Sequence, residues 1–184
     1  HYPLEFWTTS FEWAKDEETS RFVSEVSKLD NGVSIVPPDI NQSFPKFTSN
    51  PDTGKIYWSM GKIKFVGDGA TEAILTERDE NGEFFSLEEF YDRINTTKVN
   101  KRIVENLIIS GCFDELENVV DIRGREEVIN KYYEMHKVKD KDRKEFSSDK
   151  KYQWYWTLLQ KQASGLGHFD YEHLIVQTDL KYMV

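Results

Sequence analysis

The stretch from Gly61 to Arg78 constrains the fold of this chain more than any other part of the sequence. It reads GKIKFVGDGATEAILTER, in which a short segment runs into a tight, glycine-bearing turn. Asp68 is placed to cap a helix after that turn. The apolar residues of this helix recur at helical spacing: Ala70, Ala73 and Ile74. The pattern predicts two short helices around a tight turn, an arrangement that we call a hairpin unit.

A turn of this kind is suited to the capture of a phosphate group. Glycine lets the backbone approach an anion closely, and the free N–H groups at the start of a helix point toward it. The candidate phosphate ligands of this first unit are Lys62, Lys64, Val66, Gly67, Gly69 and Ala70. A purely structural pair of helices with a glycine turn is the alternative, and the spacing alone leaves both interpretations open.

A second hairpin unit follows, with helices over 86–94 and 100–110 and a turn over 95–99. Ser86 and Glu89 form a capping box at the start of the first helix. Asn100 is placed to cap the second helix, and Gly111 comes directly after its end.

Three cations lie at the start of the second helix of this unit: Lys98, Lys101 and Arg102. A cation in this position opposes the helix dipole, so it contributes little to the stability of the helix. Contact with phosphate explains the cluster better, and a solvated surface is the alternative.

The remaining sequence predicts further short elements. We expect helices over 3–14, 16–29 and 126–136, a strand over 33–36 and a β-hairpin that pairs 47–49 with 55–58. A charge-rich linker over 137–151 precedes an aromatic helix over 152–162.

The order of these motifs resembles a known family. The runs GKIKFVGDGATEAILTERDENGEFFSLEEFYDRI and VNKRIVENLIISGCFDEL are similar to the tandem helix-hairpin-helix region of the bacterial DNA polymerase III alpha subunit, a C-family replicative polymerase. HYPLEF resembles the run that closes the fingers of that polymerase, and SIVPPDIN resembles the strand before its hairpins. LLQKQASGLGHFDY loosely resembles the segment after them. The resemblance covers residues 1–118 well and the rest weakly.

The resemblance implies a mainly α fold, a tandem helix-hairpin-helix with a small β element made of a short strand and a hairpin. Residues 1–44 would be the end of the fingers and the short strand, and 45–118 the DNA-binding region. Residues 119–151 would be a helix and a charged linker, and 152–184 a C-terminal helical segment.

The same resemblance implies a region that holds the phosphate backbone of double-stranded DNA, independently of sequence, and positions the primer-template. The parent protein would be a DNA-directed DNA polymerase that uses Mg²⁺, with its catalytic aspartates in a palm upstream of this chain. We therefore assign no catalytic residue, cofactor or metal to this chain. The expected partners are the primer-template duplex and the remaining polymerase domains. Residues 177–182 faintly resemble the motif by which such polymerases bind the sliding clamp, which makes the clamp an alternative partner. An ordinary terminal segment is the preferred interpretation of 177–182.

One residue departs from the family pattern. The family reads Ile-Lys-Gly-Val-Gly in the first turn, and Phe65 stands at the first of these glycines. A side chain at this position restricts the turn or crowds the approach of the backbone to phosphate. Replacement of Phe65 by Gly is therefore expected to improve duplex binding.

Composition limits the other possibilities. The net charge of −9 argues against a free-standing nucleic-acid binder and predicts weak, salt-sensitive binding. The chain has one cysteine, no signal-peptide pattern and no apolar run near the roughly 20 residues of a membrane span, so a cytoplasmic setting is expected. The start at His1, without Met, indicates a piece of a longer protein.

Two other functions are alternatives for this sequence. Base-excision glycosylases also carry a hairpin unit followed by a catalytic Asp, a role open here to Asp79 or Asp92, but one cysteine excludes their four-cysteine cluster. A protein-interaction module is the other alternative. It would dock through Trp154 and Trp156 or through an exposed apolar patch on the first helix, made of Phe6, Trp7, Phe11 and Trp13.

Overall fold

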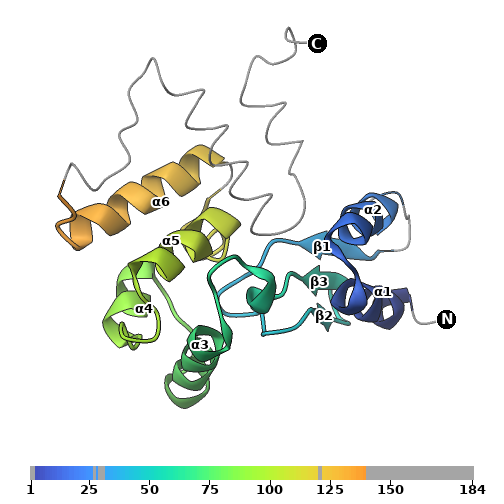
Figure 1. Ribbon diagram of the computed structural model, residues 1–184, viewed down its shortest axis with the longest axis horizontal. Helices are drawn as coiled ribbons and strands as arrows, with labels where there is room; N and C mark the ends of the chain where they lie inside the picture. The colour runs from blue at the N-terminus through green and yellow to red at the C-terminus, as the bar shows by residue number, and fades with distance from the viewer. Residues whose placement is uncertain (1–2, 27, 29–31, 120–121, 140–184) are drawn as a thin grey trace, which may run out of the picture.

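The computed structural model describes residues 3–26, 28, 32–119 and 122–139. The described part is mainly α with one small sheet. Figure 1 shows α1 and α2 beside the sheet at one end of the molecule and α3 to α6 at the other. The elements are α1 (Pro3–Trp13), α2 (Asp16–Val26), β1 (Ser34–Val36), β2 (Thr48–Asn50), β3 (Lys55–Tyr57), the 3₁₀ helix η1 (Met60–Lys62), α3 (Asp68–Asn81), α4 (Leu87–Arg93), α5 (Lys101–Ser110) and α6 (Ile122–Met135).

The first helix divides its aromatic residues between the core and solvent. Phe11 is completely buried and stacks on Phe47, with ring centroids 5.4 Å apart. Trp7 is half-buried against the core, whereas Phe6 and Trp13 are 64% and 81% exposed. The predicted four-residue exposed patch is therefore wrong for Phe11, because the rings of Phe22, Phe47 and Trp58 pack against it. It is confirmed for Phe6 and Trp13.

The sheet has the strand order β1-β3-β2. The predicted hairpin is confirmed, because β2 pairs with β3 in antiparallel register, Ser49 opposite Ile56. The strand β1 pairs with β3 in parallel, Ile35 opposite Ile56. This second pairing joins segments that are distant in sequence, which is why local patterns did not reveal it.

Both hairpin units are present. In the first, η1 leads through a turn into α3; in the second, α4 leads through a turn into α5. The predicted caps of the second unit are confirmed, since Ser86 accepts from the Glu89 N–H and Asn100 from the Ile103 N–H. Gly111 ends α5 in the left-handed conformation.

Two local predictions in the first unit are wrong. Gly67, rather than Asp68, is the N-cap of α3, and no side chain caps that end. Asp68 is already the first helical residue, so its carboxylate favours the positive end of the helix dipole instead. The helix also continues past Arg78, the last residue of the predicted unit, through Asn81 and ends only at Gly82, whose φ of +82° suits glycine.

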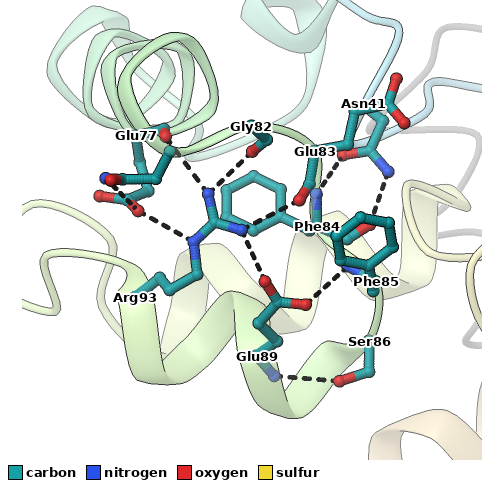
Figure 2. A network of polar contacts seen from close by, with 10 residues as sticks. Asn41, Glu77, Gly82, Glu83, Phe84, Phe85, Ser86, Glu89 and Arg93 are labelled. Carbon is teal, nitrogen blue, oxygen red and sulfur yellow. Dashed lines mark hydrogen bonds and ion pairs between the residues drawn. The ribbon is translucent and has the colours of Figure 1, made fainter.

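The two units are fastened together by Arg93, in the last turn of α4 (Figure 2). Its guanidinium bonds the side chains of Glu77 and Glu89 at 2.9 and 2.7 Å. It also donates to the Glu77, Gly82 and Glu83 carbonyls, at the end of α3. The Gly82 and Glu83 carbonyls lie just after the end of α3, where no intrahelical N–H reaches them, so Arg93 acts as a cap supplied by the second unit to the first.

The last described helix, α6, packs on α5 and α4. It begins four residues before the predicted start at Glu126. Arg125 is 4% exposed and bonds Asp114 and the Ile109 carbonyl. Lys131 bonds Glu117 and is paired with Glu88. These contacts hold α6 against both helices of the second unit.

One continuous core runs from α1 through the sheet to α6. In the described ranges, no helix is long and apolar enough to cross a membrane. The predictions for residues 140–184 lie outside the described residues. They are most of the linker, the aromatic helix with Trp154 and Trp156, and the run 177–182.

Candidate nucleic-acid interface

The first hairpin turn packs on the core through two buried side chains, and its other residues are exposed. Ile63 and Val66 are buried, and the Val66 N–H donates to the Ile63 carbonyl at 3.0 Å. The Ala70 N–H donates to the Gly67 carbonyl at 3.0 Å, and the Ala70 methyl is buried. The N–H groups of Val66 and Ala70, two of the predicted ligands, are therefore already engaged within the turn.

Three other N–H groups at this turn remain available. Among the described residues, no acceptor receives the N–H of Gly67, Asp68 or Gly69. Gly67 and Gly69 are exposed, and a Cβ on either would meet nothing within 4 Å. Free amides on exposed residues at a helix start form an arrangement that can bind a phosphate oxygen.

The lysines of this turn are exposed. Lys62 lies at the end of η1 and Lys64 in the turn itself. The Lys64 ammonium is 5.4 Å from the ring centroid of the neighbouring Phe65. An acidic group, Asp68, lies beside them in the first turn of α3. The turn thus combines free amides with two lysines, and the adjacent Asp68 carboxylate offsets part of their positive charge.

Phe65 has an unusual backbone. Its φ is +70°, in the left-handed region that glycine adopts far more easily. Phe65 is 44% exposed, so burial of its ring in the core does not account for this backbone conformation. The guanidinium of Arg102 lies over this ring, with its Cζ 3.4 Å from the ring centroid.

The second hairpin presents its cations in different directions. Lys101 lies 3.8 Å from Glu105 and over the ring of Tyr133, on the side of α6. Arg102 is directed to the first hairpin instead, and Lys98 is exposed in the turn. The structure therefore brings Arg102 together with Lys64, while Lys101 is engaged by its own helix and by α6.

The contact between Arg102 and Phe65 places the two hairpins side by side. Sequence reasoning named Arg102 but missed the contact, because it joins residues 37 positions apart. A signal was available: an aromatic residue at a turn position that requires a positive φ needs a compensating contact.

The described residues contain no group of three or more His, Cys, Asp or Glu that could hold a metal ion. Cys112 is completely buried, and burial raises the pKa of its thiol well above the ordinary value. A buried, protonated thiol is a poor nucleophile.

Residues 32–120 match the family model described as a helix-hairpin-helix motif. This part of the chain is a helix-hairpin-helix region. It is similar to the DNA polymerase III subunit alpha of Vibrio cholerae, with 41% identity over 117 residues, 63% of this chain and 10% of the relative. The same subunit of Escherichia coli K12 is 40% identical over 118 residues, again 63% and 10% of the two chains.

This chain also matches a more distant relative over a longer span. The DNA polymerase III subunit alpha of Buchnera aphidicola is 33% identical over 142 residues, which cover 76% of this chain and 12% of the relative. The chain spans about a tenth of the length of the curated relatives it matches. These matches confirm the resemblance to the polymerase III alpha subunit.

Proposed function

We propose that the helix-hairpin-helix region of this chain binds the phosphate backbone of double-stranded DNA and positions a primer-template in a replicative polymerase. The observation that supports this proposal is the first hairpin turn, where the N–H groups of the exposed residues Gly67, Asp68 and Gly69 have no acceptor among the described residues. Lys64 and Arg102 supply positive charge beside them. Homology to the polymerase III alpha subunit supplies the context.

Contacts of this kind carry no base information. Backbone amides and cations meet phosphate oxygens, which are the same in every sequence. We therefore propose binding that is independent of sequence. The net charge of −9 opposes association with DNA, so we expect this chain alone to bind DNA weakly. We also expect its affinity to fall steeply as the salt concentration rises.

The parent protein is proposed to be a DNA-directed DNA polymerase that works in the cytoplasm with Mg²⁺. The chain itself would be a non-catalytic part, and its other partners would be the remaining polymerase domains. Contact with the sliding clamp through 177–182 stays a prediction. Reaction with an abasic-site duplex tests the glycosylase alternative, and no cleavage is expected.

The test is a salt titration of duplex affinity by fluorescence anisotropy, with two unrelated labelled duplexes. Replacement of both Lys64 and Arg102 by Ala should weaken binding to both duplexes alike. The slope of log affinity against log salt should fall by about two, one for each lost phosphate contact.

The control removes the same charge from the other end of the molecule. Lys15 is exposed between α1 and α2, and Arg21 is exposed on α2. These two helices lie at the opposite end of the molecule from α4 and α5 (Figure 1). The Lys15→Ala/Arg21→Ala variant has the same net charge as the test variant. Equal losses in the two variants would mean a general charge effect and would remove the proposed phosphate site.

A second candidate function rests on α1. Phe6 and Trp13 are exposed on this helix and line a shallow groove with Glu5, Thr9 and Ser10. Exposed aromatic side chains on one face are typical of docking surfaces. We propose that a polymerase domain packs here, which is compatible with DNA binding elsewhere. Replacement of Phe6 and Trp13 by Ser should leave duplex affinity unchanged and abolish capture of the remaining polymerase domains supplied as a separate chain.

A further inference from the structure

We infer that Phe65 is a positioning residue, which holds Arg102 against the first hairpin so that both hairpin units present one shared phosphate site. The inference rests on the proposed function and specifies how the two hairpin units act together in it. It gives a role to a residue that departs from the family pattern of glycine at this position.

The first observation is the backbone of Phe65. Its φ of +70° is a conformation that bulky residues rarely adopt, and it persists only where the surroundings enforce it. The other non-glycine residues with positive φ in the described ranges are Asn118 and Lys137. Phe65 is the aromatic one, and its ring projects to the surface instead of filling the core. The core therefore does not explain why Phe stands at this turn.

The second observation is the contact that the ring makes. The Arg102 Cζ is 3.4 Å from the ring centroid, which is van der Waals contact. Among the described residues, no carboxylate pairs with Arg102, whereas its neighbour Lys101 lies 3.8 Å from Glu105. The ring of Phe65 is thus what fixes the position of the Arg102 guanidinium.

Stacking uses the face of a guanidinium and leaves its edge free. The N–H donors lie in the plane of the group, so a ring against the face does not occupy them. Arg102 can therefore donate to a phosphate while it rests on Phe65. Because the side chain is already ordered, less rotamer freedom is lost when the phosphate binds.

The ring of Phe65 lies near cations from both hairpin units. Lys64 of the first hairpin lies 5.4 Å from the centroid, and Arg102 of the second lies 3.4 Å from it. Two like charges at one place repel each other, and the negative face of an aromatic ring offsets part of that repulsion. A glycine at position 65 would have no ring on which Arg102 could stack and none to reduce the repulsion between the two cations.

The test compares four variants of the full 184-residue chain at low salt. Phe65→Tyr keeps the ring and should bind duplex DNA within twofold of the wild type. Phe65→Leu keeps an apolar side chain of similar size without the aromatic face and should bind about two- to fivefold more weakly, the range expected for an exposed cation–aromatic contact. Phe65→Leu/Arg102→Ala should bind no more weakly than Arg102→Ala alone, because Phe65 acts through Arg102.

A fifth variant separates binding from folding. Phe65→Gly relieves the strained backbone, so its thermal unfolding temperature should rise or stay unchanged while duplex affinity falls. This expectation is the reverse of the one drawn from the family pattern. Tighter binding by Phe65→Gly would overturn the inference.

The outcomes distinguish this inference from the proposed function. A wild-type chain that binds no duplex at low salt overturns both. A wild-type chain that binds, with Phe65→Leu unaffected or with losses from Phe65 and Arg102 that simply add, overturns the positioning role alone. Non-additive losses with rescue by Tyr support it.

Discussion

The backbone of Gly111, which ends α5, lies directly against the guanidinium of Arg125 in α6. A Cβ on Gly111 would stand 2.7 Å from Nη2 of Arg125 and 2.8 Å from Oδ2 of Asp114. The same guanidinium bonds Asp114 and the Ile109 carbonyl. The left-handed glycine therefore does two things at once: it ends the helix and leaves room for the ion pair that attaches α6.

Replacement of Gly111 by Ala should destabilise the fold by about 1–3 kcal/mol, because φ is +95° and the new methyl group meets the ion pair. The measurement is urea unfolding followed by circular dichroism. Gly69→Ala is the control, since its φ is not positive and its Cβ meets nothing within 4 Å. A Gly111 variant as stable as the control would contradict the tight contact.

Replacement of Gly69 by Ala should separate stability from DNA binding. A methyl group in the first turn of α3 favours the helix by up to about 0.5 kcal/mol. It has room there, since a Cβ on Gly69 meets nothing within 4 Å, and it adds bulk at a residue that carries one of the free N–H groups. Stability should therefore rise slightly while duplex affinity falls. Thr76→Ala, exposed further along the same helix, should leave affinity unchanged. An unaltered affinity in Gly69→Ala would remove the amide site.

Replacement of Arg93 by Met should cost about 2–4 kcal/mol of stability, because the Glu77 carboxylate and the Gly82 and Glu83 carbonyls after α3 lose a donor. The matched control is Arg21→Met. Arg21 pairs with Glu25 on the exposed face of α2, so its loss should cost less than about 0.5 kcal/mol. Similar losses in both variants would show that the Arg93 network adds no more than a surface pair.

Acidification should weaken the packing of α6 through His136. Its ring lies 3.6 Å from that of Tyr91 and 4.7 Å from that of Tyr132, and burial lowers the pKa of the imidazole, with Asp92 acting in the opposite direction. The unfolded chain then binds the proton more readily than the folded one. The contribution of neutral His136 is complete above pH 6.5 and is lost as the pH falls from there through the lowered pKa.

The measurement is urea unfolding at pH 7.5 and pH 5.5, for the wild type and for His136→Phe. Other titrating groups contribute alike to both chains, so the difference between them isolates His136. The wild type should lose more stability than the variant on acidification. Equal losses would mean that His136 titrates as it does in the unfolded chain.

Local signals in the sequence were sufficient for much of the fold. The caps at Ser86 and Asn100 and the helix end at Gly111 follow from short-range hydrogen bonds and backbone preferences, which depend only on neighbouring residues. The hairpin of β2 and β3 follows from the turn between the two strands. The cap at Asp68 was wrong because Gly67 takes that position itself, with no side chain to satisfy the first amides.

The sequence by itself determined that the chain has two hairpin units with glycine and cations at their turns. Only the tertiary structure decided which of those groups meet. Lys101 and Arg102 are adjacent in sequence, yet one lies against α6 and the other on Phe65. The same holds for Phe11, buried under the sheet, and for the parallel pairing of β1 with β3. Side-chain direction and long-range pairing depend on which elements pack together, and no pattern of neighbouring residues encodes that.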